Sequence, residues 1–171
     1  MKKLITVLIL VLITLQINAQ IEKGTWLLGG SASFSSNATT GAGNSNFTTV
    51  ISPMAGYFIK DKLAIGTQAA FQSQSSVYSS FSIAPFVRYY FLPKDKKLNL
   101  FGNGSFGYQS TSYTIGGSAS TTSWQLAAGP ELFITDNIGL TFTLSYGSSS
   151  SGNSSMNTVS TNIGFQIHLN N

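Results

Sequence analysis

From Thr25 onward, apolar and polar residues alternate almost without interruption. The alternation is clearest near the end of the chain, where one face carries Val159, Thr161, Ile163, Phe165, Ile167 and Leu169, and the other carries Thr158, Ser160, Asn162, Gly164, Gln166 and His168. A period of two is typical of β-strands whose two faces meet different surroundings. A water-soluble sandwich would alternate in the same way, but the small polar residues of the second face favour a narrow, packed barrel interior.

The same alternation predicts seven more strands, at about 25–35, 47–59, 63–72, 78–92, 98–109, 123–134 and 138–146. The connections between them are of two kinds. Three are short and charged (60–62, 93–97 and 135–137), and four are longer and uncharged (36–46, 73–77, 110–122 and 147–157). Outer-membrane barrels have short periplasmic turns and longer extracellular loops, so this order predicts that both termini are periplasmic.

The composition indicates a surface that faces lipid. Only 8% of the residues are charged, against about 25% in soluble domains. A soluble surface needs charge, whereas a lipid-facing surface avoids it. The hydrophobic content of 42% argues against a disordered chain. The predicted fold is therefore all-β, an eight-stranded antiparallel up-and-down transmembrane β-barrel.

The N-terminus is typical of an exported protein. Lys2 and Lys3 precede an apolar run from Leu4 to Leu15, and Ala19 provides a small residue for cleavage. The run is shorter than the roughly 20 residues that span a bilayer, which favours a signal peptide over an uncleaved anchor. We expect a signal peptide at residues 1–19 and an outer-membrane barrel domain at 20–171, located in the outer membrane of a Gram-negative bacterium.

The charges and the metal-binding residue types indicate neither a nucleic-acid partner nor a cofactor. Two of the nine basic residues lie in the signal peptide, which leaves seven against five acidic residues. Those that remain form no basic face with interleaved aromatic residues, as nucleic-acid binding requires. Cysteine is absent and there is one histidine, too few ligands for the usual zinc sites.

Aromatic residues bracket the predicted strands. Trp26, Tyr57, Tyr89 and Phe91 lie toward the turns, and Phe34, Phe47, Phe71, Tyr108, Trp124 and Tyr146 lie toward the loops. Two aromatic belts at the membrane interfaces are expected of a barrel wall.

Two further features concern the strand interiors. Arg88 and Glu131 are the only charged residues well inside strands, and both fall on the polar face. Similar distances from their turns predict an ion pair in the lumen, with Gln68, Asn103 and Gln125 as neighbours. Proline cannot donate to a sheet ladder, so local bulges are predicted at three strand positions. They are Pro53, Pro85 and Pro130.

The sequence resembles the small outer-membrane β-barrel family that includes OmpX and the OmpA barrel. The resemblance rests on the signal peptide and on GTWLLGG at 24–30, GYFIKDKLAIG at 56–66 and IGFQI at 163–167. It implies a monomer whose partners are outer-membrane lipid and, during biogenesis, periplasmic chaperones and the barrel-assembly machinery. Many relatives end on an aromatic residue read by that machinery, whereas this chain ends Leu169-Asn170-Asn171. Two alternatives are open: Phe165 serves instead, or the tail suits the machinery of a different lineage.

No catalytic site is predicted. His168, Ser160 and Glu131 formally make a Ser/His/Glu set, but His168 is expected at the periplasmic rim, where the geometry of a triad is not expected. Three function classes remain open. A structural or surface-interaction barrel leads, a narrow channel for small solutes follows, and a lipid-acting enzyme is third.

Overall fold

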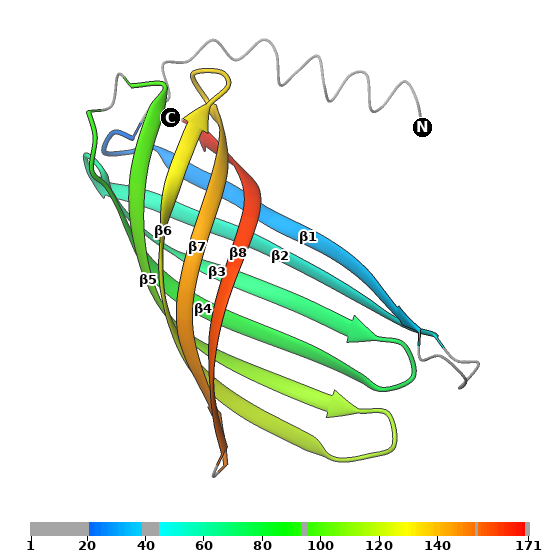
Figure 1. The fold of residues 1–171 in the computed structure, drawn as a ribbon. Coiled ribbons are helices and arrows are strands. Elements are labelled where there is room, and N and C mark those ends of the chain that lie inside the picture. Colours follow the sequence, from blue (N-terminus) through cyan, green and yellow to red (C-terminus); the bar gives the residue numbers. More distant parts are fainter. Residues whose placement is uncertain (1–20, 39–44, 94–95, 153, 170–171) are drawn as a thin grey trace.

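The chain forms one closed antiparallel sheet in the computed structural model, which describes residues 21–38, 45–93, 96–152 and 154–169. The strands are β1 (Trp26–Ala38), β2 (Ser45–Lys60), β3 (Leu63–Gln74), β4 (Tyr78–Tyr90), β5 (Leu98–Tyr113), β6 (Ser118–Phe133), β7 (Ile138–Ser151) and β8 (Ser154–Leu169). Each strand pairs with the next, and β8 returns to β1 (Figure 1). The predicted eight-stranded up-and-down barrel is confirmed.

Alternation along each strand separates an apolar outer wall from the interior. In β4, Ile83 and Val87 are exposed, while Phe86, Arg88 and Tyr90 are buried. The exposed positions of the other strands are also rich in large apolar side chains, which suit a wall in contact with lipid. No helix among the described residues is long and apolar enough to span a membrane.

The β2–β3 and β6–β7 turns lie at the same end of the barrel as the start of β1 and the end of β8, and the β3–β4 and β5–β6 loops lie at the other end (Figure 1). Local chemistry shapes the turns. Lys62 adopts a left-handed φ of 67°. In the β6–β7 turn, the Thr135 hydroxyl accepts hydrogen bonds from the backbone N–H groups of Asn137 and Ile138.

The strands continue well into segments that were predicted to be loops. β5 reaches Tyr113, β6 begins at Ser118, and β7 and β8 extend to Ser151 and Ser154. These extensions are rich in Ser and Thr on both faces. The ladder hydrogen bonds persist there, but the apolar-polar contrast that marks a strand in sequence does not.

The prolines interrupt the ladder without shifting it, so the predicted bulges are wrong. Bonded pairing is missing beside Pro53 between β2 and β3, beside Pro85 between β4 and β5, and beside Pro130 between β6 and β7. In each case the register is the same on both sides of the gap. The loss of one donor is tolerated locally, and the register shift found in β2 instead lies between Phe58 and Lys60.

Candidate functional site in the barrel interior

The turn end of the barrel is filled by a plug, which we define as the buried side chains of Leu27, Phe58, Tyr90, Phe101, Glu131 and His168 together with Ile21. Six strands each contribute one of these side chains. Ile21 comes from the segment 21–25, which precedes β1 and folds beneath the strands. The Ile21 carbonyl accepts a hydrogen bond from the Lys62 N–H at 2.9 Å, and the Gly24 N–H donates to Phe58 at 2.9 Å. The plug therefore seals this end with the barrel's own side chains and a short N-terminal segment.

At the centre of the plug, Glu131 is fully buried and accepts two hydrogen bonds. The Tyr90 hydroxyl donates to Oε2 at 2.6 Å, and Nε2 of His168 lies 2.8 Å from Oε1. Gly139 makes room for the carboxylate, since a Cβ at that position would overlap it. Hydrogen bonds to a charged acceptor are the stronger kind, so this cluster ties β4, β6 and β8 together across the lumen.

The His168 ring lies among aromatic rings. Its centroid is 5.2 Å from that of Phe133, 5.8 Å from that of Phe58 and 6.2 Å from that of Tyr90. Its Nδ1 atom is the one buried side-chain nitrogen or oxygen in the described part of the chain without a hydrogen-bond partner. The Glu131 contact therefore holds the Nε2 side of the ring, while the Nδ1 side has no hydrogen-bond partner among the surrounding aromatic rings.

Arg88 lies above the plug, toward the loops, and its partners are neutral. It donates to Gln166 Oε1 at 2.8 Å and to Asn103 Oδ1 at 3.4 Å. The guanidinium carbon lies 4.4 Å from the centre of the Phe101 ring, within the range of a cation–π interaction. The side chain is 6% exposed.

The predicted ion pair between Arg88 and Glu131 is thus replaced by two separate sets of contacts. Both residues face the lumen as predicted, and Asn103 is a neighbour of Arg88 as predicted. The register explains the difference. Arg88 is opposite Asn103, which is opposite Ala127, and Glu131 lies four residues farther along β6, roughly 13 Å at about 3.3 Å per residue. Arg88 and Glu131 are each two residues from the turn-side end of their strand, so counting from the turns did not reveal this offset, which lies in the register between the strands.

The formal Ser/His/Glu set is only partly brought together. Glu131 contacts His168, but the Ser160 hydroxyl lies 2.8 Å from that of Ser145. Ser160 is eight residues from His168 along β8, about 26 Å at strand spacing. The contact joins two members of the formal set, and Tyr90, which was not among the residues predicted from sequence, completes the cluster. Its inward phase in the alternation was the available signal.

The predicted belt residues lie on the outer surface, and because the strands extend beyond the predicted bounds, the loop-side residues Tyr108 and Trp124 lie well inside β5 and β6. Toward the turns, the Trp26 and Tyr57 rings are 5.1 Å apart and the Tyr89 and Phe91 rings 5.4 Å apart. Toward the loops, the Trp124 and Tyr146 rings are 5.7 Å apart. That these rings mark the membrane interfaces stays a prediction.

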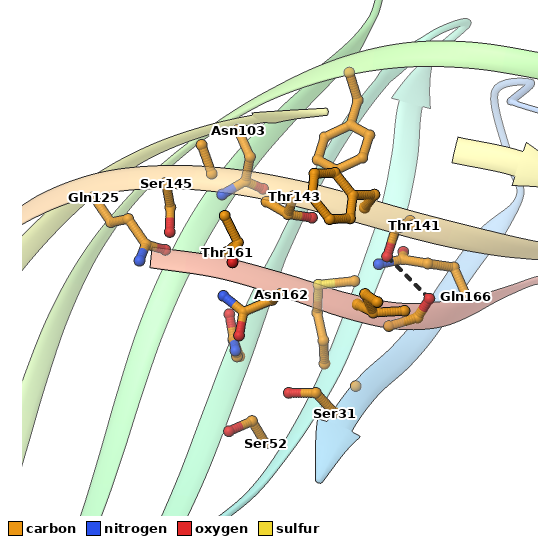
Figure 2. Close-up of a pocket in the computed structure, with 18 of the residues that line it drawn as sticks. Ser31, Ser52, Asn103, Gln125, Thr141, Thr143, Ser145, Thr161, Asn162 and Gln166 are labelled. Carbon is orange, nitrogen blue, oxygen red and sulfur yellow. Dashed lines mark hydrogen bonds between the residues drawn. The ribbon is translucent and has the colours of Figure 1, made fainter. Parts of the chain in front are cut away.

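A cavity of about 580 Å³ occupies the lumen above the plug. Figure 2 shows small polar side chains from several strands around it, among them Ser31, Asn103 and Gln125. Arg88 and Phe101 line the same cavity, and the described residues hold no cluster of His, Cys, Asp and Glu able to bind a metal. The cavity offers hydrogen-bonding groups and a single positive charge.

Comparison with known proteins agrees with this architecture. The family model described as outer membrane protein β-barrel domain matches residues 5–168. The chain belongs to this family. It is an outer-membrane β-barrel whose environment includes membrane lipid. A comparison with curated protein sequences gives no significant match.

Two solved structures are similar in fold. Neisserial surface protein A has a TM-score of 0.60 at 14% identity, with 85% of this chain and 97% of that chain covered. The N-terminal β-barrel domain of Pseudomonas aeruginosa OprF has a TM-score of 0.61 at 12% identity, with 86% and 98% covered. At these identities the likeness concerns the fold alone.

Proposed function

We propose that this family member is a non-enzymatic structural or surface-interaction barrel, which does not conduct solutes and acts through its loop end. The plug is the observation that carries this proposal. Phe58, Tyr90 and His168 fill the lumen at the turn end with less than 2% exposure. Eight strands leave an interior that side chains just fill, so a continuous water path is not expected.

The assignment of sides follows from the same architecture. We propose that residues 1–19 are removed on export, that both termini are periplasmic, and that the loops reach the cell exterior. Chaperones and the barrel-assembly machinery are the proposed partners during biogenesis, and a monomer is the proposed state. The distance between Ser160 and His168 supports the absence of a serine-type catalytic site.

Planar-bilayer recording tests the proposal against the channel alternative. The purified wild-type barrel is expected to give no conductance steps. A variant in which Phe58→Ala and Tyr90→Ala open the plug, and which keeps the heat-modifiable migration of a folded barrel, is the positive control and is expected to conduct. Regular conductance steps from the wild type would contradict the proposal and favour a channel.

A further inference from the structure

The seam between β1 and β8 is paired at the turn end only. Bonded pairing runs from Trp26 opposite Leu169 to Gly30 opposite Phe165. β1 continues to Ala38 and β8 begins at Ser154, yet these parts pair only with β2 and β7. Figure 1 shows the blue and red strands separating toward the loop end. Among the described residues, 31–38 and 154–164 therefore form two unpaired edges that border an opening in the wall.

Side-chain exposure agrees with an opening at this place. Val159 on β8 is 69% exposed, whereas Val87, within the continuous wall, is 51% exposed. Likewise, Ile163 on β8 beside the seam is 67% exposed, whereas Ile65 on β3 within the continuous wall is 43% exposed. The outward side chains beside the seam lack the cover that a bonded neighbouring strand provides elsewhere.

Unpaired backbone is tolerated at membrane depth only where it is buried in protein or lines a water-filled cavity. The seam meets this condition, because residues 30–33 of β1 and 161–164 of β8 line the 580 Å³ lumen cavity. The opening therefore connects a cavity lined largely by polar side chains with the apolar surroundings of the barrel wall.

Arg88 provides the charge at the floor of this cavity. Its hydrogen-bond acceptors, Gln166 and Asn103, are neutral, and no carboxylate in the described chain lies within salt-bridge distance of it. Glu131 interacts with this cation only at longer range. The buried guanidinium therefore has no directly paired anion, and an anion that can reach it is favoured. Gln166, which accepts a hydrogen bond from Arg88, is two residues along β8 from Gly164, where the seam opens, roughly 7 Å at strand spacing.

We propose that the cavity binds the anionic head group, a carboxylate or phosphate, of a membrane amphiphile whose acyl chain passes through the seam into the lipid. Arg88 pairs with the anion, and the amide and hydroxyl groups of the lining complete its hydrogen bonds. The apolar chain leaves between the outward side chains of Phe34 and Ile163. The site shares Phe101 with the plug but does not include Phe58 or Tyr90, so binding and conductance are measured on different residues and the two proposals can fail separately.

Binding to the purified barrel in neutral detergent, at fixed micelle concentration, tests the proposal. The probes are hexadecanoate, hexadecanol with the same chain and no charge, and hexanoate with the same head and a short chain. We expect one hexadecanoate per barrel, bound at least tenfold more tightly than either of the other probes.

Two variants test the role of Arg88. Arg88→Met removes the charge. Asn103→Asp preserves shape and places a carboxylate where the amide oxygen now lies 3.4 Å from the guanidinium Nε, so it neutralises the cation without emptying the site. Both are expected to weaken hexadecanoate binding at least tenfold, while Lys60→Met, at an exposed position beside a turn, leaves it unchanged. Heat-modifiable migration confirms that each variant is folded.

A third variant tests the seam. The chain has no cysteine, so Ser33→Cys with Asn162→Cys places two thiols at positions that the β1–β8 register, if continued, makes opposite. A short bifunctional thiol reagent should abolish hexadecanoate binding, whereas separate alkylation of the two thiols should not. Unchanged binding after cross-linking would overturn the lateral route.

The other outcomes are equally decisive. Wild-type affinity in both Arg88→Met and Asn103→Asp would overturn the assignment of Arg88. Equal binding of hexanoate would mean that the site takes a soluble anion and would overturn the membrane source. Equal binding of hexadecanol would overturn recognition of an anionic head.

Discussion

The contact between Glu131 and His168 is expected to stabilise the barrel more than any other single polar contact of the plug. Both side chains are fully buried, and within the part of the chain that the structure describes the carboxylate has only His168 and Tyr90 as hydrogen-bond donors. His168→Phe keeps a ring inside the aromatic cage but removes one of these donors. Glu131→Met keeps a side chain of similar length but removes the acceptor.

The expected losses differ because the two changes strand different groups. His168→Phe leaves a buried carboxylate with Tyr90 alone, which costs about 3–5 kcal/mol. Glu131→Met leaves the buried Tyr90 hydroxyl and the His168 Nε2 atom without their partner, at about 1–3 kcal/mol each. In the double variant both members of the Glu131–His168 contact are replaced by apolar side chains, which can pack against each other. Only the Tyr90 hydroxyl is then left without a partner. The double variant should therefore be more stable than the sum of the single losses predicts. These losses imply a coupling energy of several kcal/mol, at or above the roughly 3 kcal/mol that residues in direct contact reach.

Urea unfolding in lipid vesicles measures these free energies, with heat-modifiable migration reporting the folded fraction. The matched control is a second cycle between Glu131→Met and Gln125→Ala. Gln125 lies on the same strand and lines the cavity, but six residues away. Its losses should add within about 0.5 kcal/mol. A coupling energy for Glu131 and His168 no larger than that of the control cycle would refute the assigned contact.

Three other predictions test the wall, the sidedness and the processing. Phe142→Arg, on the outer wall, should destabilise the barrel by about 2–4 kcal/mol, whereas Thr143→Arg, in the cavity lining, should cost clearly less in the same urea titration; equal losses would reverse the assigned faces. An impermeant thiol reagent on whole cells should label Ile115→Cys in the β5–β6 loop and not Lys96→Cys near a turn, and the opposite pattern would invert the topology. The intact mass of the membrane-extracted protein should correspond to a chain that begins at Gln20, and a mass that includes residues 1–19 would contradict cleavage.

The strands were predictable only where the two faces of the sheet meet different surroundings. Where one face of a strand meets lipid and the other meets the lumen, apolar and polar side chains alternate, and the sequence shows a period of two. Near Ser118 and Ser151 the strands continue, but both faces carry small polar residues. Hydrogen bonding holds these parts in the sheet, and backbone hydrogen bonds leave no mark on residue type.

Which interior residues meet depends on register, which sequence pattern constrains weakly. The alternation correctly placed Arg88, Glu131 and His168 on the inner face. It could not show that Glu131 lies four residues below the level of Arg88 along the ladder, because the offset accumulates over two strand pairings. His168, and not the predicted Arg88, is therefore the residue that pairs with Glu131.

The open seam is the feature that alternation least reveals, because both of its edges keep a strand-like pattern. Its position is explained by the plug. β8 pairs with β1 only beside His168, and the contact of His168 with Glu131 holds that same end of β8 against β6 across the lumen. Closure of the barrel therefore rests on a short ladder and one buried polar cluster at the turn end. Since no equivalent contact crosses the seam at the loop end among the described residues, loss of the Glu131–His168 contact should loosen β8 from β1 before it disturbs any other strand pair.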